Sequence, residues 1–398
     1  MNIIFLSYRE NNPFIGGIEK VTHLLSKELV ARGFHVTHIA QINTNSYKKY
    51  TPTCDEFFLP EKNHILSEQN YIFLSEIVKQ RKTQILVNQY STTVGFNTLC
   101  YKIKKEFPKI KIVTPLHLEP LYRLKDESNR FFVSQRNGKD LKKWFKDLFL
   151  FTRFHVHYKR KLLREIKKEI EYIEYISDRV ILLSEHVKKD ILYIKGNENI
   201  SKYDSINNPI EYKETDTNEK KNQILYVGRI EFGLKRIDRI IDIWTAVENV
   251  KKDWSLIVIG DGSYRNLFEE IAIKRGLKNI KFIGFQDPTE YYKNSHILCL
   301  SSTSEGFANV LVEAQAHGCI PIAFNSFSAL NDIIIDGWNG YAVPAFNKKS
   351  FTDKVLNLMN NEYLLHHMQA NAKEHSKRFY INRITDQWEN LFKNLLNE

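Results

Sequence analysis

Residues 297–314 read ILCLSSTSEGFANVLVEA, and this stretch decides the fold that we expect for the chain. Its first four residues form a short apolar run that predicts a buried strand, and the pattern after Asn309 predicts a helix. Gly306 allows a tight turn between the two. A strand that leads directly into a helix is the repeating unit of a doubly wound α/β fold.

The same alternation extends on both sides of this stretch. Strands in the second half are predicted at 223–227, 255–259, 280–283 and 320–324, with helices at 236–247 and up to about 274. The first half repeats the pattern, with strands at 2–6, 34–40, 84–87, 110–114 and 179–183 and a first helix that Gly33 ends. We therefore expect two doubly wound parallel-sheet domains.

The polar segment 211–222 is the best candidate for a linker between these domains. It divides the chain into an N-terminal domain over 1–210 and a C-terminal domain over 223–378, followed by a helix at 379–398. Two open α/β sheets place their ligands beyond the carboxyl ends of their strands. Facing lobes would enclose a cleft there.

Composition limits the class of protein. Apolar residues make up 42% and charged residues 26% of the 398 residues, which excludes a collagen-like, coiled-coil or mainly disordered chain. No apolar run is long enough to span a membrane and the start lacks signal-peptide features, so we expect a cytoplasmic protein. The four cysteines are scattered, and the net charge of +11 suggests an anionic partner: nucleic acid, a phosphorylated small molecule or a membrane surface.

Two carboxylates flank the helix start in the quoted stretch. Glu305 precedes the helix and Glu313 lies about one turn beyond Asn309, so both can border one pocket. Between them, the amides of residues 307–310 are expected to point outward at the positive end of the helix dipole, which suits an anion. The alternative is a helix-start charge at Glu305 and a solvated glutamate at Glu313.

A second group of candidates follows the strand at 223–227. Arg229 can fork onto two phosphate oxygens and Lys235 supplies a point charge, an arrangement suited to a diphosphate. Taken singly, each is more often a solvated or ion-paired surface residue. Gly16-Gly17, after the first strand, could bring backbone amides close to the same diphosphate.

Other strand ends carry weaker signals. Gly260-Asp261-Gly262 follows a strand, but Arg265 stands where a dinucleotide fingerprint has its third glycine, so we discount a nicotinamide or flavin site. Phe285 offers an aromatic edge to a base, and ordinary core packing is the alternative. His117 follows a first-domain strand, where a lone histidine is often structural. The sequence has no metal-ligand spacing, so we expect no metal and no cofactor.

A long basic segment, Arg136 to Lys168, contains apolar residues at helical spacing with lysines alongside. Such a helix can lie on an anionic bilayer or cover a lipid-linked substrate. It can equally pack on the first domain.

Taken together, the chain resembles the retaining glycosyltransferases of family 4, which have the GT-B architecture of two facing Rossmann-like domains. The resemblance rests on Glu305 to Glu313, which match a Glu-x7-Glu motif, and on Gly228-Arg229 with the block 235–238. Gly16-Gly17 and Asn208-Pro209-Ile210 support it. In this architecture the helix at 379–398 would cross back to the N-terminal domain.

The resemblance implies roles for these residues. Arg229 and Lys235 would clamp the donor diphosphate, Glu313 the ribose, Glu305 the donor sugar, and His117 its hydroxyls. The candidate catalytic residues are therefore Glu305, Arg229, Lys235 and His117; the candidate donor-binding residues are Gly16, Gly17, Gly228, Asp261, Gly262, Phe285, Gly306, Phe307, Ala308, Asn309 and Glu313.

The function expected from the resemblance is transfer of a sugar, with retained configuration, from a nucleotide-diphosphate donor. A uridine donor and a surface glycan or lipid-linked acceptor are favoured, with a possible peripheral site at the inner membrane face. Within the same architecture, a nucleotide-sugar epimerase or a phosphorylase is the alternative. A nucleic-acid-binding protein is a further alternative that no recognisable module supports.

Overall fold

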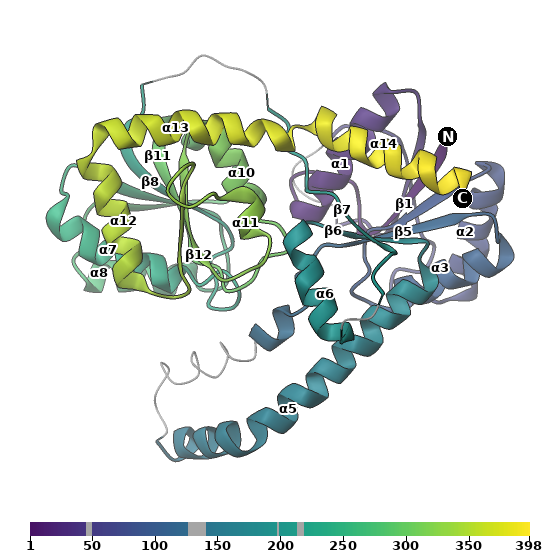
Figure 1. The fold of residues 1–398 in the computed structure, drawn as a ribbon, viewed down its shortest axis with the longest axis horizontal. Helices are drawn as coiled ribbons and strands as arrows, with labels where there is room; N and C mark the ends of the chain where they lie inside the picture. The colour runs from purple at the N-terminus through teal and green to yellow at the C-terminus, as the bar shows by residue number, and fades with distance from the viewer. Residues whose placement is uncertain (45–49, 126–140, 197–198, 213–218) are drawn as a thin grey trace. The chain divides into compact units, whose positions relative to one another are not determined.

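The structure is a computed structural model that describes residues 1–44, 50–125, 141–196, 199–212 and 219–398, without the side chains of 141–156. It divides into two compact units (Figure 1). The first comprises 1–120, 163–211 and 379–398, and the second comprises 121–162 and 212–378. The fold predicted from the strand and helix pattern is confirmed in each unit.

The first unit is built on a seven-stranded parallel sheet with the order β3-β2-β1-β4-β5-β6-β7. The order reverses beside β1, as it does in doubly wound folds. Its strands are β1 (Asn2–Arg9), β2 (His35–Ile42), β3 (Asp55–Phe58), β4 (Ile85–Asn88), β5 (Lys111–Leu116), β6 (Arg179–Leu182) and β7 (Tyr203–Ser205).

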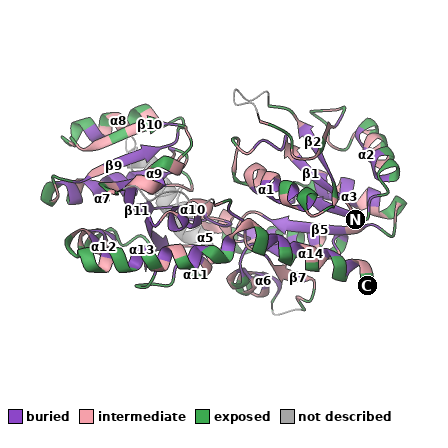
Figure 2. Ribbon diagram, turned by 90° about the horizontal axis from the view of Figure 1, so that it is seen from above, coloured by how far each residue is buried: buried purple, intermediate pink, exposed green. Residues whose placement is uncertain are grey.

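Helices cover both faces of this sheet because successive residues of a strand point to opposite sides. Ile3 and Phe5 pack with helix α1 and the last helix, α14, whereas Ile4 and Leu6 pack with α2 and α3. Figure 2 shows the strands buried and the outer helix faces exposed. The helices of this unit are α1 (Gly17–Ala31), α2 (Glu68–Gln80), α3 (Val94–Glu106), α6 (Lys188–Lys195), α14 (Ile381–Asn397) and the part of α5 (Leu141–Ile176) from residue 163.

Helix α14 is held in the first unit by its apolar face and by one arginine. Trp388 and Phe392 are buried with Leu25 and Leu29 of α1. At the edge of this contact, Arg32 pairs with Asp386 at 2.6 Å and with Glu389 at 3.2 Å. The last turn of the chain is therefore part of the core of the unit that contains β1.

The second unit contains a six-stranded parallel sheet with the order β10-β9-β8-β11-β12-β13. Here the order reverses between β8 and β11. The strands are β8 (Lys221–Val227), β9 (Ser255–Ile259), β10 (Ile280–Gly284), β11 (Ser295–Leu300), β12 (Ile320–Asn325) and β13 (Tyr341–Pro344).

The helices of the second unit bury one apolar face each. Trp244 of α7 and Phe351 of α12 are fully buried against Tyr226 and Val258 of the sheet. The helices are α7 (Ile237–Val250), α8 (Arg265–Lys274), α9 (Thr289–Asn294), α10 (Asn309–Ala316), α11 (Leu330–Ile333), α12 (Lys348–Asn360) and α13 (Glu362–Ser376).

Some predictions fall outside what the structure describes. The basic segment 136–168 is one of them, because residues 126–140 and the side chains of 141–156 are not described. The predicted linker 211–222 is described only at its two ends. Among the described residues, no helix has both the length and the apolar character needed to cross a membrane.

Candidate active site

The candidate active site lies at the carboxyl ends of β8 and β11, the neighbouring strands between which the sheet order reverses. In open α/β sheets this reversal is where ligands bind, because the helices that follow the two strands lie on opposite faces and leave a crevice. The loop after β8 carries Arg229 and Lys235, and the loop after β11 carries Glu305.

Backbone hydrogen bonds join these two loops. The Thr303 amide donates to the Leu234 carbonyl at 2.7 Å. The Ser301 hydroxyl lies 3.0 Å from the carbonyl of Lys235 and 2.8 Å from that of Arg236. These contacts therefore fix the two loops relative to each other.

Lys235 and Glu305, two of the predicted catalytic residues, are in direct contact. Lys235 Nζ donates to Glu305 Oε1 at 2.7 Å, and the Ser302 hydroxyl donates to the same oxygen at 2.6 Å. The side chains are only 21% and 12% exposed. An ammonium has three donors, so Lys235 can hold the carboxylate and still donate to an anion.

Three charged residues just beyond Lys235 are buried, although no role was predicted for them from the sequence. Arg236 pairs with Asp238 through two hydrogen bonds of 2.9 Å, and Arg239 donates to the Ser301 carbonyl at 3.0 Å. The Arg239 guanidinium also lies 3.9 Å from the ring centroid of Phe346. These contacts tie the start of α7 to the loop after β11.

Arg236 has a left-handed backbone, with φ of +49° at the residue before α7. This conformation costs about 1–2 kcal/mol for a residue with a Cβ, and the paired guanidinium offsets it. The block 235–238 was noticed in the sequence, but two arginines and an aspartate at a helix start are more often solvated. Their burial could not be predicted from the pattern.

The glycines at the neighbouring strand ends allow close backbone approach. A Cβ at Gly260 would lie 1.9 Å from the Gly228 carbonyl oxygen, and one at Gly262 would lie 2.4 Å from that of Ile230. The Gly228 amide donates to Ile259, and that of Ile230 to Asp261. The glycines are thus explained by packing of the β8 and β9 ends, while the exposed Asp261 accepts from the Gly262 amide.

Arg229 and Glu313, two further predicted site residues, contact side chains other than those of Lys235 and Glu305. Arg229 is 71% exposed and lies 3.7 Å from Glu231. Glu313 accepts a 3.1 Å hydrogen bond from the buried hydroxyl of Tyr292, whose pKa is raised well above its usual value, mainly by burial and further by Glu313. Tyr292 was not identified from the sequence, where it stands in an unremarked helix of six residues.

The start of α10 differs in part from the prediction. The Asn309 amide donates to the Phe307 carbonyl at 2.9 Å and closes the turn, so the prediction that the amides of 307–310 all point outward is wrong for this one. Gly306, Phe307 and Ala308 are buried. Phe285, which follows β10, is 59% exposed.

The remaining candidates belong to the first unit. Gly16 directly precedes α1, and a Cβ there would lie 2.5 Å from Glu19 Oε2. His117 follows β5, and its Nε2 lies 2.5 Å from Gln89 Oε1. Burial lowers the pKa of His117 to about 4, so the ring is neutral at pH 7. The predicted shared site of Gly16, Gly17 and His117 with the second unit stays a prediction.

No group of three or more histidine, cysteine, aspartate or glutamate side chains within the described ranges could hold a metal ion. The expectation of a site without a metal stays a prediction. At the β8 and β11 ends, Lys235 and Glu305 make a charged surface that can hold an anion and hydroxyl groups together.

Known glycosyltransferases resemble this chain in sequence and in fold. Residues 207–375, which contain every second-unit candidate, match the family model "Glycosyl transferases group 1". An uncharacterized glycosyltransferase of Methanocaldococcus jannaschii is 31% identical over 52% of this chain and 57% of its own length. The poly(ribitol-phosphate) alpha-N-acetylglucosaminyltransferase of Staphylococcus aureus is 26% identical over 85% of this chain and 66% of its own. The chain spans about half to two thirds of the length of these and the other first curated relatives.

The structure of Staphylococcus aureus TarM, solved with UDP, alpha-GlcNAc-glycerol and fondaparinux, has a TM-score of 0.73 to this chain at 14% identity, covering 98% of this chain and all of the other. At this identity the likeness shows the fold, which is GT-B. The candidate site lies where the second sheet reverses its order, within the part of the chain that the family model covers. Residues 207–375 of this chain are therefore similar to the glycosyl transferases of group 1.

Proposed function

We propose that this protein transfers a sugar from a nucleotide-diphosphate donor, a UDP-sugar, to a surface glycan or a lipid-linked glycan. The observation that carries the proposal is the contact of Lys235 with Glu305 at 2.7 Å where the second sheet reverses its order. The names of two similar proteins support the donor and the acceptor: one acts on poly(ribitol-phosphate) and one was solved with UDP.

Charge complementarity indicates which residues bind the diphosphate of the donor. The diphosphate gains negative charge as the sugar leaves, and cations fixed in advance stabilise that charge best. Lys235 is held by Glu305, and the exposed Arg229 guanidinium is available for a forked contact with phosphate oxygens. Glu313 accepts the ribose hydroxyls, and Phe285 lies against the base. The reaction needs no metal and no further cofactor.

The chemistry proposed is transfer with retention. The bond between the anomeric carbon and the donor phosphate oxygen breaks, and the acceptor oxygen forms its bond to that carbon on the same face. The acceptor proton passes to the departing phosphate oxygen, so charge and atoms balance. Glu305 contacts the donor sugar, and the neutral His117 hydrogen-bonds the sugar hydroxyls.

The place of the reaction follows from the acceptor. Lipid-linked glycans are anchored at the inner, anionic face of the cytoplasmic membrane, which attracts basic proteins. The net charge of +11 supports a cytoplasmic protein with peripheral contact at that face.

The direct test is turnover of a panel of UDP-sugars and GDP-sugars with membrane-extracted or synthetic lipid-linked acceptors, with and without EDTA. We expect one UDP-sugar to be consumed only in the presence of acceptor, with EDTA having no effect and nuclear magnetic resonance of the product showing the anomeric configuration of the donor. Glu305→Ala and Arg229→Ala should each abolish most turnover. Normal turnover by both variants would overturn the proposal, and donor consumption without acceptor would favour an epimerase.

A further inference from the structure

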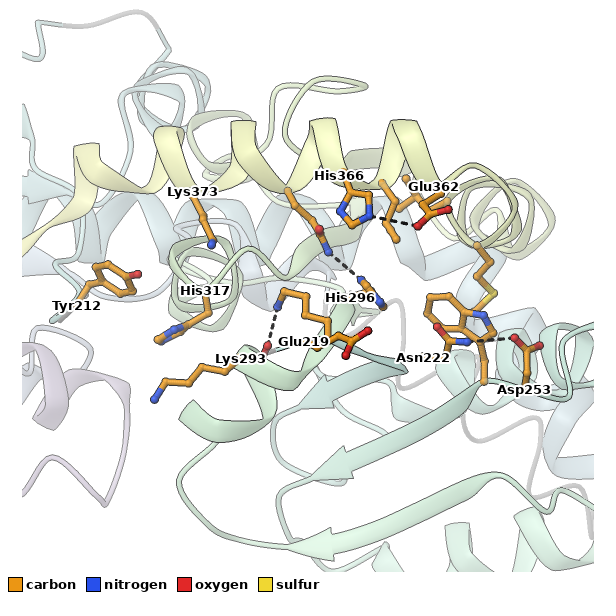
Figure 3. Close-up of a pocket in the computed structure, with 16 residues that line it drawn as sticks. Tyr212, Glu219, Asn222, Asp253, Lys293, His296, His317, Glu362, His366 and Lys373 are labelled. Atoms are coloured by element: carbon orange, nitrogen blue, oxygen red, sulfur yellow. Dashed lines mark hydrogen bonds and ion pairs between the residues drawn. The ribbon is translucent and has the colours of Figure 1, made fainter. Parts of the chain in front are cut away.

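A cavity of about 790 Å³ lies at the amino-terminal ends of the strands of the second sheet, the edge opposite the candidate active site. Its walls come from residues at the starts of β8, β9, β11 and β12 and from helices α9, α12 and α13. Figure 3 draws the lining side chains. We call it the amino-edge pocket. No residue of the candidate active site lines it.

One end of the amino-edge pocket is cationic. In the view of Figure 3, His317 lies between Lys373, which comes from α13, and Lys293, which comes from α9. Lys293 is 18% exposed and pairs with Glu290 at 2.7 Å, outside the pocket lining. Lys373 is half-buried, and among the described residues no carboxylate forms an ion pair with it.

The acidic side chains of the pocket belong to its other part. Asp253 accepts a 3.1 Å hydrogen bond from Asn222, and Glu362 lies 3.6 Å from His366. Figure 3 draws the carboxylate of Glu219 on the Asn222 side, away from His317. The cationic end therefore lacks a carboxylate of its own in the lining.

A third lysine strengthens the positive field at this end. Lys220 Nζ donates to the carbonyls of Tyr292, Lys293 and Ser295 at 2.8–3.0 Å, so its three donors are used and its charge is fixed in the wall. Burial, together with a smaller effect of Lys373, lowers the pKa of Lys220 to about 8.

The neighbouring lysines also affect the pKa of His317. Burial, followed by Lys220 and Lys293, lowers the pKa of His317 to about 4, while Glu313 and Glu290 act in the opposite direction. The ring is packed between aromatic neighbours, with centroids 5.2 Å from Tyr212 and 6.1 Å from Tyr292. A bound anion would add to the partial compensation that Glu313 and Glu290 give.

We propose that the amino-edge pocket binds a small phosphate-class anion, orthophosphate or a phosphate monoester, held by Lys373, Lys293 and His317. Phosphate oxygens accept several charge-assisted hydrogen bonds at once, and Figure 3 draws Lys373 and Lys293 on either side of His317 at this end of the pocket. The remaining volume accommodates a group attached to the phosphate. This inference goes beyond the proposed function and does not depend on it.

The test is the titration of the histidine rings by nuclear magnetic resonance in the full chain, between pH 4 and 7.5, with orthophosphate or with chloride at equal ionic strength. His317 is assigned by its absence in His317→Gln. An anion beside an imidazole favours the charged form, so orthophosphate should raise the pKa of His317 by about one pH unit or more and leave that of His375, outside the pocket, in place. Glycerol 3-phosphate in a parallel series separates a free phosphate from a phosphate monoester as the occupant; binding of either supports the site.

Lysine-to-glutamine variants inside and outside the pocket test whether phosphate binds in the amino-edge pocket. Lys373→Gln and Lys293→Gln should each weaken phosphate affinity, measured at pH 6 from the His317 signal, by about tenfold. Lys349→Gln, which removes an equal charge from a side chain that is 88% exposed, should not. Arg229→Ala should leave the His317 response unchanged, which separates this pocket from the candidate active site. An equal response of all histidines, no response to either phosphate, or normal binding in both pocket variants would overturn the proposal.

Discussion

At the scale of single residues, the central feature of the candidate site is the contact between Lys235 and Glu305. Their 2.7 Å contact fixes the position of the lysine that we propose to hold the donor diphosphate. Such preorganisation is where electrostatic catalysis gains most of its rate. Glu305 then has two roles, because the carboxylate that orients the lysine is also the one proposed to contact the donor sugar.

Glu305→Gln tests this pairing with little change in shape. The amide oxygen can still accept from Ser302, but the charge that holds Lys235 is gone. We expect kcat/KM to fall by about a hundredfold or more, with unfolding free energy reduced by only about 1–2 kcal/mol. Steady-state kinetics and urea unfolding measure the two effects. Glu270→Gln, a matched change at an exposed residue, should alter neither, and an active Glu305→Gln enzyme would contradict the pairing.

Tyr292 is a positioning residue for Glu313. Its hydroxyl donates to the carboxylate at 3.1 Å from a fully buried ring. Tyr292→Phe removes one hydrogen bond of about 1 kcal/mol, so the KM for the donor should rise about fivefold while kcat stays close to normal. Donor-concentration series measure this split. Tyr291→Phe, one residue away with its hydroxyl on Gln286, is the control, and an equal effect of both would refute a specific role.

At the scale of elements, the strand ends of the second sheet fit together only through glycine. Gly260 has φ of +135°, and a Cβ there would meet the Gly228 carbonyl at 1.9 Å. Gly276 also has positive φ, +70°, but has nothing within 4 Å of its Cβ position. Substitutions at Gly260 and Gly276 can therefore distinguish the energetic cost of a steric clash from the cost of backbone strain alone.

Gly260→Ala should therefore lower the unfolding free energy by about 3 kcal/mol or more, and Gly276→Ala by about 1 kcal/mol. Chemical denaturation of the two variants beside the parent measures the difference. Equal decreases in unfolding free energy for the two variants would contradict the close contact between the ends of β8 and β9.

How much of the fold could be predicted from sequence depends on the kind of element. Buried parallel strands such as β8 and β9 are continuous apolar runs, and their bounds were predicted to within two residues. β3 is a partly exposed Asp-Glu-Phe-Phe edge strand, so no apolar run marks it. The six-residue α9, which carries Tyr292, is too short to show a helical period.

The candidate site, too, could be predicted from the sequence only in part. Glu305 and Lys235 were predicted to lie together because both follow strands, and the contact confirms this proximity. The buried charges of Arg236, Asp238 and Arg239 were missed, because a sequence does not show that a charged side chain will find a partner inside. The amino-edge pocket was missed because its lining comes from strand beginnings far apart along the chain.

At the scale of the whole molecule, three buried or half-buried histidines link stability to pH. Burial is the first cause that lowers the pKa of His117, His296 and His317 to about 4 from the ordinary 6.5. Between these values the unfolded chain binds protons that the folded protein does not, so stability rises with pH. Their contribution is complete above about pH 6.5 and is lost as the pH falls toward 4.

Unfolding free energy should thus decrease steadily from pH 6.5 to 4, and proton uptake on unfolding should be measurable in this window. His317→Gln should reduce the slope for the second unit, while His367→Gln, at an exposed position, should leave it unchanged. Denaturant titrations at half-unit pH intervals give these slopes. A flat profile in the parent protein would show that the three rings are protonated when folded.

The central claim is that the cations after β8 hold the donor diphosphate. Its most direct test is calorimetric titration of UDP into the parent protein, Arg229→Gln, Lys235→Gln and, as a control of equal charge, the exposed Lys252→Gln. The account predicts that each of the first two variants weakens UDP binding by about tenfold or more, while Lys252→Gln and the parent bind alike. UDP binding of equal strength in all four proteins, or in none, would contradict it.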